Sequence, residues 1–483
     1  MVFGSAAFLF GFLPVLFILY RLTPGIKAKN VLLILFSLIF YAFGKLSYVP
    51  LLLGSALVNW GAGRLLDAVE KRRKLILTAA VVIDLGLLAV FKYLDFFIEN
   101  IDAVFGVSIA SAGLALPVGI SFFTFTGLSY VIDVYRRPET MSRSFWRVLL
   151  YISLFPNLLA GPILSYKVAA PQIDDRRTGP ELTARGIRRF IVGLAKKVLV
   201  ADIAGGMVDA IFSQSVLDAR IAWLAAVSYA VQIYFDFSGY SDMALGLGNM
   251  FGFVFPENFN QPYIARSMTD FWKRWHISLT TWFRNYLYMP MVMSKSRQRR
   301  YKKWAVRYGR RKADKLSVIL PMAVVWLLTG LWHGADWTFV IWGVWQGLWC
   351  VLEGVGVIRT DKLERSMGGR IAGHVYTIFL VLLGVVLFRS DGLAQAGSLY
   401  AAMFAGWKFT AEGTLLLQKQ LTGLNVACLA IGVAGSAVPL SWLKSHTGRW
   451  GSPASYAVCA ALFALCVMCM AGGGFAPFIY AQF

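Results

Sequence analysis

Apolar stretches long enough to cross a bilayer recur along the whole chain, separated by short segments that contain Lys and Arg. A membrane helix needs about 20 mainly apolar residues, so each stretch predicts a spanning helix. The predicted spans are 5–20, 30–44, 48–63, 75–94, 116–137, 187–212, 221–237, 316–333, 336–353, 371–388, 420–440 and 455–475. We therefore predict an all-α polytopic membrane protein with about twelve transmembrane helices, forming a single domain over residues 1–483.

The charged residues predict how these helices are oriented. Basic segments such as 71–74 and the loop 294–315 favour the cytoplasmic side, whereas the acidic 95–102 favours the outer side. Both termini are then expected outside. The net charge of +22 is explained by topology and anionic lipid heads, so nucleic-acid binding is not expected. The first apolar run has no basic segment before it, so we interpret it as a transmembrane span rather than a removable signal peptide.

Two segments are predicted not to cross. The stretch 148–165 contains two prolines and a glycine and has basic residues on both sides, which predicts a re-entrant element whose backbone groups are buried in protein or face water. The stretch 269–288 mixes cationic and aromatic residues at helical spacing. Its apolar face, formed by Phe271, Trp275, Leu279 and Trp282, predicts an interfacial helix.

His333 is the first candidate for chemistry, because it lies in the apolar, tryptophan-rich stretch 328–347. Ionisable side chains at membrane depth are costly and therefore suggest function. A neutral imidazole can take a proton from a hydroxyl. A structural histidine in the core is an equally good explanation from the pattern alone. His276 is the other histidine in aromatic surroundings, and no spacing around either one predicts a metal site.

Seven motifs in order along the chain resemble the membrane-bound O-acyltransferase (MBOAT) family, above all its bacterial alginate O-acetyltransferase branch. They lie at 117–125, 155–162, 235–242, 256–263, 271–278, 331–334 and 477–483. The resemblance implies a helical membrane enzyme that uses cytoplasmic acetyl-CoA, with no permanently bound cofactor or metal. The family's catalytic histidine of the Trp-His-Gly motif corresponds to His333. Its second histidine, in Arg-Trp-His-Ile-Ser, corresponds to His276, which would orient a reactant or stabilise developing charge.

The same motifs supply candidate substrate-binding residues, and the resemblance implies partners. The candidates are Trp332, Tyr240, Asp242, Asn258, Asn260, Arg274 and Trp275. In this branch the acetyl group crosses the bacterial inner membrane to an exported or cell-wall polysaccharide, often through a separate periplasmic serine-esterase-like protein.

Two alternatives stay open at this point. One is D-alanyl transfer to teichoic acid, as in a related branch of the family. The other is a non-enzymatic transporter of polysaccharide or lipid, whose polar intramembrane residues would serve passage. The chain also departs from the branch after Arg284, where Asn285 replaces an acidic residue and 289–293 lacks the usual glycines. This leaves the donor and the polymer undetermined.

Overall fold

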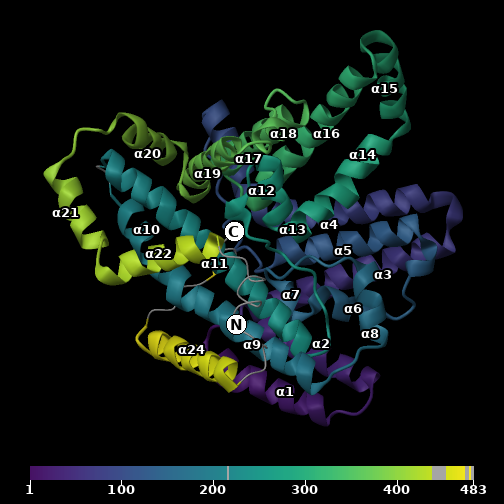
Figure 1. Ribbon diagram of the computed structural model, residues 1–483. Helices are drawn as coiled ribbons and strands as arrows, with labels where there is room; N and C mark the ends of the chain where they lie inside the picture. The colour runs from purple at the N-terminus through teal and green to yellow at the C-terminus, as the bar shows by residue number, and fades with distance from the viewer. Residues whose placement is uncertain (215–216, 438–452, 474–477, 480–483) are drawn as a thin grey trace. The chain divides into compact units, whose positions relative to one another are not determined.

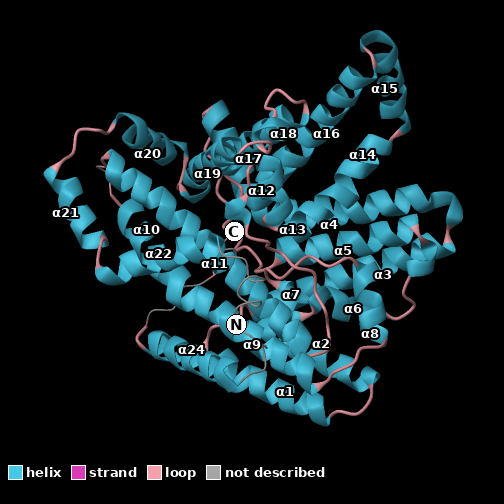
Figure 2. Ribbon diagram, in the orientation of Figure 1, coloured by secondary structure: helices cyan, strands magenta, loops and turns pink. Residues whose placement is uncertain are grey.

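The computed structural model describes residues 1–214, 217–437, 453–473 and 478–479. Every regular element among these residues is a helix (Figure 2), which confirms the all-α prediction. The chain divides into two compact units, the first containing 1–194, 240–257 and 477–483, and the second 195–239 and 258–476. The single domain over 1–483 stays a prediction. Of the closing motif at 477–483, only Phe478 and Ile479 are described.

Six described helices are long and apolar enough to cross a membrane, and a seventh span is possible if one bent pair is counted. They are Leu46–Ala68, Glu70–Phe105, Ala219–Met250, Arg310–His333, Met367–Arg389 and Pro453–Ala471, with the pair Ala411–Gln420 and Gly423–Ala437 bent by 73°. A polytopic membrane protein is confirmed. The number of such helices is lower than the predicted twelve, because other apolar stretches form helices that are shorter or carry more polar residues.

The first unit contains the helices of the N-terminal part of the chain and the end of α11. Their bounds are η1 Ala7–Phe12, α1 Leu13–Leu22, α2 Ile26–Ala42, η2 Leu46–Tyr48, α3 Val49–Ala68, η3 Glu70–Arg72, α4 Arg73–Phe105, α5 Ile120–Arg136, η4 Pro138–Thr140, α6 Phe145–Ser153, α7 Phe155–Leu158, α8 Tyr166–Asp174 and α9 Pro180–Lys196. Helices α3, α4 and α5 lie side by side (Figure 1). Glycine at 127 is required for this packing, because a Cβ there would lie 2.5 Å from Asn59 Nδ2.

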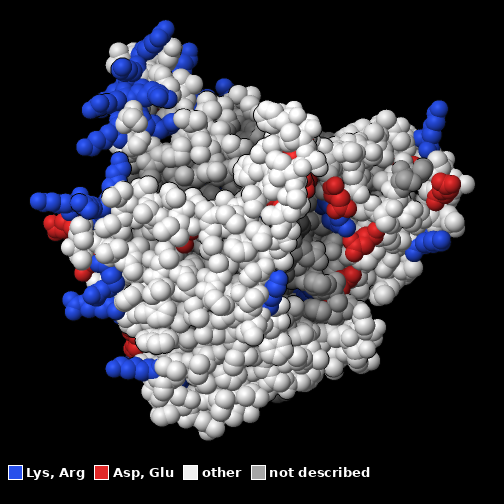
Figure 3. Space-filling view, turned by 180° about the vertical axis from the view of Figure 1, so that it is seen from behind, with Lys and Arg blue, Asp and Glu red and all other residues white. Residues whose placement is uncertain are grey.

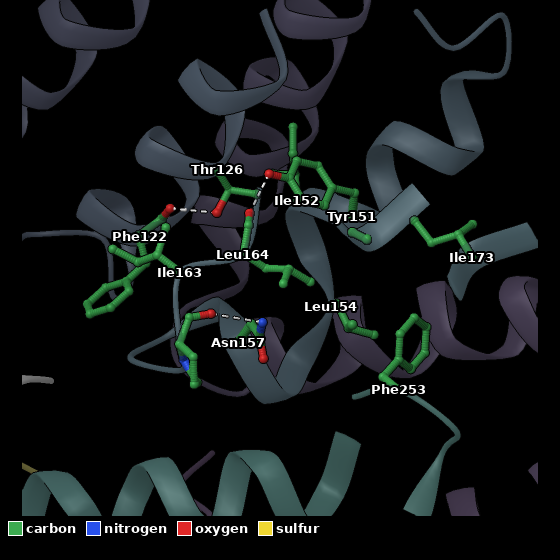
Figure 4. A pocket seen from close by; sticks show the side chains of 12 residues that line it. Phe122, Thr126, Tyr151, Ile152, Leu154, Asn157, Ile163, Leu164, Ile173 and Phe253 are labelled. Carbon is green, nitrogen blue, oxygen red and sulfur yellow. Dashed lines mark hydrogen bonds between the residues drawn. The ribbon is translucent and has the colours of Figure 1, made fainter. Parts of the chain in front are cut away.

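The predicted re-entrant stretch is broken into the short helices α6 and α7, neither of which could span a bilayer. Side chains form hydrogen bonds with three of its backbone groups inside the protein, as expected for non-helical backbone at membrane depth. The Phe155 N–H donates to Ser37 Oγ, Asn157 Nδ2 donates to the Pro162 carbonyl, and the Tyr151 hydroxyl donates to the Leu164 carbonyl. Figure 4 shows the last two bonds around a small cavity of about 20 Å³, which has room for about one water.

The second unit contains most of the C-terminal half. Its helices are η5 Lys197–Ala201, α10 Asp202–Phe212, α11 Ala219–Met250, η6 Pro262–Ile264, α12 Met268–Arg274, α13 Ile277–Phe283, η7 Arg284–Tyr288, α14 Met289–Met293, α15 Lys295–Tyr308, α16 Arg310–His333, α17 Trp337–Gly354, α18 Thr360–Leu363, α19 Met367–Arg389, α20 Leu393–Ala405, α21 Ala411–Gln420, α22 Gly423–Ala437 and α24 Pro453–Ala471. From Tyr240 onwards α11 belongs to the first unit.

Helices α16 and α17 form the hairpin that the sequence predicts around His333, and glycines let them approach closely (Figure 1). A Cβ on Gly330 would lie 2.5 Å from the Phe339 carbonyl oxygen, and a Cβ on Gly343 would lie 2.6 Å from that of Trp326. Small residues at such crossings bring helix backbones into direct contact in membrane proteins. The hairpin therefore has a fixed geometry at the level of His333.

Two predictions for the segment before this hairpin were wrong. The helix expected over 269–288 is interrupted between α12 and α13, and the residues of its predicted apolar face Phe271, Trp275 and Leu279 are buried within the protein. The basic stretch 294–315 is not a loop: it forms α15, which packs against the start of α16. Lys and Arg side chains crowd this end of the hairpin (upper left in Figure 3).

Candidate functional site

His333 is the last residue of α16 and is almost completely buried, with 4% of its surface exposed. Its ring meets Trp342 and Phe388 edge to face, at centroid distances of 4.9 and 5.1 Å. The helix ends here because Gly334 is extended, and a Cβ at Gly334 would overlap the ring of Phe339. Asp336 then caps the next helix, since its Oδ1 accepts the Thr338 N–H at 2.7 Å. The imidazole is thus held at a helix end among aromatic rings.

His276 occupies the break between α12 and α13 and is fully buried. Its backbone φ is +44°, which makes it one of two described non-glycine residues in the left-handed region, together with Gln261. A bulky residue in this conformation costs free energy and is retained where the surrounding structure fixes it. The periodicity of 269–288 could not reveal the break, because no glycine or proline marks it.

The hydrogen bonds of Asn258 fix the tautomer of His276. The side-chain oxygen Oδ1 of Asn258 accepts the Ser278 backbone N–H at 3.1 Å and the Ser278 hydroxyl at 2.8 Å. A backbone N–H is always a donor, so the atom that it meets is the amide oxygen. His276 Nδ1 lies 3.1 Å from the same oxygen and must therefore donate to it. The lone pair of the ring is then on Nε2. Burial lowers the pKa of His276 to about 3, so the ring is neutral.

Because His276 is buried in its neutral form, we expect the stability of the folded protein to depend on pH. The folded pKa of about 3 lies below the ordinary value of 6.5, so below pH 6.5 the unfolded chain binds a proton that the folded protein does not. The free energy of unfolding should fall by about 2 kcal/mol between pH 7 and pH 5 from this group alone. Thermal unfolding in detergent measures the loss, and His276→Gln should remove that part of the slope. An unchanged slope in the variant would contradict the assignment.

Trp332 is buried and contacts both histidines. Its ring is 6.1 Å from that of His276 and 4.9 Å from that of His333, measured between centroids. All three belong to the second unit. The structure therefore brings the two histidines that the sequence singled out, which lie 57 positions apart, into contact with the same indole.

A buried carboxylate, Glu353 of α17, holds the start of α12. Its Oε1 accepts the Met268 N–H at 2.8 Å, and its Oε2 accepts the Thr269 N–H at 2.8 Å and the Thr269 hydroxyl at 2.6 Å. A carboxylate at a helix N-terminus is stabilised by the unpaired N–H groups and by the helix dipole. Glu353 was not among the residues predicted from the sequence, although an acidic residue inside a predicted span is a signal of function.

A cavity of about 490 Å³ adjoins α12, α13 and α16. Its walls are mainly apolar, and it also has hydroxyls and the two exposed cations Lys273 and Arg284; the lining residues are Thr269, Trp272, Lys273, Ile277, Leu279, Thr280, Thr281, Phe283, Arg284, Tyr288, Met322, Val325, Trp326, Thr329 and Cys350. Neither histidine is among them. The wall nevertheless includes Ile277, next to His276, and Thr329, one turn before His333. Such a cavity suits an elongated, partly apolar ligand with an anionic end.

Three other candidate binding residues of this unit have structural contacts and do not line the cavity. The Asn260 N–H donates to the Arg274 carbonyl at 2.9 Å, and Arg274 Nε pairs with Asp270 at 2.9 Å. Trp275 packs against the rings of Phe259 and Phe271. These residues join the loop after Asn258 to the end of α12, which fixes the position of His276.

The remaining two candidates, Tyr240 and Asp242, belong to the first unit. Asp242 Oδ1 accepts two bonds from Arg189, at 3.0 Å from Nε and 2.8 Å from Nη2. Tyr240 is buried, and its ring stacks on Phe3 and Phe478. The carboxylate of Asp242 is therefore part of an ion pair.

Several known proteins are similar to this chain. The family model described as MBOAT, membrane-bound O-acyltransferase family, matches residues 134–306. A probable alginate O-acetylase AlgI of Azotobacter vinelandii is 39% identical over 445 residues, covering 91% of this chain and 84% of that protein. The peptidoglycan O-acetyltransferase of Helicobacter pylori is 33% identical, covering 82% and 78%. A teichoic acid D-alanyltransferase of Streptococcus thermophilus is 28% identical, covering 52% and 59%. The chain belongs to the membrane-bound O-acyltransferase family and is an O-acyltransferase.

Proposed function

We propose that this protein transfers acetyl groups from cytoplasmic acetyl-CoA for the O-acetylation of an exported or cell-wall polysaccharide. The observation that carries the proposal is the cavity whose wall includes Ile277, next to His276, and Thr329, one turn before His333. Its apolar walls suit the pantetheine arm and acetyl group, and Lys273 and Arg284 suit the phosphates of the donor. The relatives named as alginate and peptidoglycan O-acetyltransferases support a polysaccharide acceptor.

In the proposed reaction, His333 acts as the general base. Its neutral imidazole takes the proton from an acceptor hydroxyl while the hydroxyl oxygen attacks the thioester carbonyl. The C–O bond forms, the C–S bond breaks, and the departing thiolate takes the proton back from His333. No net proton is released. His276 orients a reactant beside Trp332, and the surrounding aromatic rings exclude water from the thioester.

The proposal includes a location and partners. In the proposal the protein lies in a bacterial inner membrane with both of its termini on the outer side. This orientation places the basic helix α15 in the cytoplasm. The acetyl group would leave on the outer face, directly to the polymer or through a periplasmic serine-esterase-like protein. Membership of a family of O-acyltransferases argues against the non-enzymatic transporter of polysaccharide or lipid. D-alanyl transfer remains the second candidate, supported by the partial similarity to the teichoic acid enzyme.

Oriented membrane vesicles test this function. Inside-out vesicles expose the cytoplasmic face to added labelled acetyl-CoA, and right-side-out vesicles do not. We expect label on the acceptor polysaccharide only with inside-out vesicles that contain this protein. Labelling that requires a D-alanyl carrier protein in place of acetyl-CoA would support the second candidate. Equal labelling of both vesicle types would contradict the direction of transfer.

A further inference from the structure

The outward face of α15 is a row of cations beside the first turns of α16. Residues 295–315 contain eleven Lys and Arg and a single acidic residue. Four of these cations lie on one exposed face of α15, at positions i, i+4, i+7 and i+8 of the helix: Lys295, Arg299, Lys302 and Lys303. This cationic row forms no salt bridge with a carboxylate of the described residues. Its charge is therefore available to an anion outside the protein.

Two contacts fix the register between α15 and α16. Arg297 donates to the Ser317 carbonyl, and the Tyr301 hydroxyl donates to Asp314 Oδ1 at 2.8 Å. Because the higher number on α15 pairs with the lower number on α16, the two helices are antiparallel neighbours (Figure 1). The cationic row, which points away from these contacts, therefore lies alongside residues 312–319 of α16.

This register places the cationic row at the depth of lipid headgroups. The apolar part of α16 begins at Leu316, and Leu320, one turn further, is 48% exposed, as expected for a side chain that contacts lipid. At 1.5 Å per residue, the row lies within about 7 Å of Leu316 along the helix axis. The headgroup region of a leaflet is about 5 to 7 Å thick. Lys and Arg side chains are long enough to reach its phosphates from either edge.

We propose that the cationic row of α15 binds the anionic phospholipid headgroups of the adjoining leaflet, with phosphatidylglycerol as the probe. The four side chains diverge along the outside of a helix, where Lys and Arg crowd the surface (upper left in Figure 3). A soluble polyphosphate is held by groups that converge on it, whereas a diverging row fits a layer of separate headgroups. The cavity proposed for acetyl-CoA includes no residue of α15, so this surface is distinct from the donor site.

Photolabelling in nanodiscs tests the proposal without using activity. The full-length protein is placed in nanodiscs with a small fraction of phosphatidylglycerol that carries a photoreactive headgroup, and mass spectrometry locates the adducts. We expect adducts on residues 295–303, in higher yield than with the matching phosphatidylcholine analogue. In Arg299→Gln/Lys302→Gln this excess should fall about 25-fold, because each cation at the membrane surface changes the binding of an anionic lipid about fivefold.

The matched control is Arg307→Gln/Arg310→Gln, which removes the same charge from the exposed turn between α15 and α16. This turn lies about 9 Å or more from Leu316, beyond the screening length in physiological salt, so the excess should change by no more than about twofold. Thermal unfolding verifies that both variants are folded.

Three results would overturn the proposal. One is an equal yield of adducts in the wild type and in folded Arg299→Gln/Lys302→Gln. Another is labelling by the phosphatidylcholine analogue as strong as that by phosphatidylglycerol, which would show lipid contact without recognition of charge. The third is loss of the adducts when soluble acetyl-CoA is added, which would assign the cationic row to the phosphates of the donor.

Discussion

Replacing His333 by alanine is expected to lower the rate of acetyl transfer by about 10² to 10⁴, the usual contribution of a general base. The reason is that His333 takes the proton in the proposed reaction, and the rings of Trp332, Trp342 and Phe388 that contact it cannot act as a base in its place. The initial rate of transfer from labelled acetyl-CoA in inside-out vesicles measures the effect. The loss should appear in kcat rather than in KM, because His333 accepts the proton in the transition state and not in the complex with bound substrates.

Alanine at 333 also leaves a gap among aromatic rings, so loss of folding must be separated from loss of chemistry. His333→Gln fills most of the volume but does not act as a base, and should be as inactive as His333→Ala. The matched control is His374→Ala on α19, an exposed histidine, which should retain normal activity. A folded His333→Gln protein with a rate within about twofold of wild type would show that His333 is not the base.

The second large effect is expected for Glu353→Ala, which should lower the free energy of unfolding by about 3 kcal/mol. The substitution leaves the Met268 and Thr269 N–H groups at the start of α12 without their acceptor in a buried position. Because α12 leads directly into His276, the rate of transfer should fall as well. Thermal unfolding in detergent, measured together with the transfer rate, tests both effects.

Two further variants sharpen this prediction. Glu353→Gln keeps the shape but turns an amide NH2 toward backbone donors, so it should be nearly as damaging as alanine. Glu412→Ala, at an exposed glutamate in the first turn of α21, should change the free energy of unfolding by no more than about 0.5 kcal/mol. Equal stability of Glu353→Ala and Glu412→Ala would mean that Glu353 does not hold α12.

Local patterns in the sequence predicted many of the helices and the place of one candidate functional residue. The apolar stretches around 316–333 and 336–353 correspond closely to α16 and α17, and His333 lies at the hairpin between them. The two prolines and the glycine of 155–162 predicted a broken segment, which the structure confirms. Each of these features depends on residues that are neighbours along the chain. That is the information which periodicity and turn chemistry contain.

Features that depend on distant residues could not be predicted in this way. The break at His276 is stabilised by Asn258, eighteen positions earlier, and the start of α12 by Glu353, more than eighty positions later. The number of described helices that are long and apolar enough to span, six or seven, is smaller than the number of apolar stretches, because some of these stretches form shorter helices that are buried in protein. Helix α5, for example, has 17 residues, most of them buried.

The most direct test of the central claim, that the donor binds in the cavity beside His276 and His333, is photolabelling with an acetyl-CoA analogue that carries a photoreactive acyl group. Mass spectrometry of the labelled protein should place the adducts on α13 and on the 322–329 part of α16. Excess acetyl-CoA should suppress them, and Thr329→Trp, which narrows the cavity, should reduce them. Adducts confined to other helices, with full labelling of Thr329→Trp, would contradict the account.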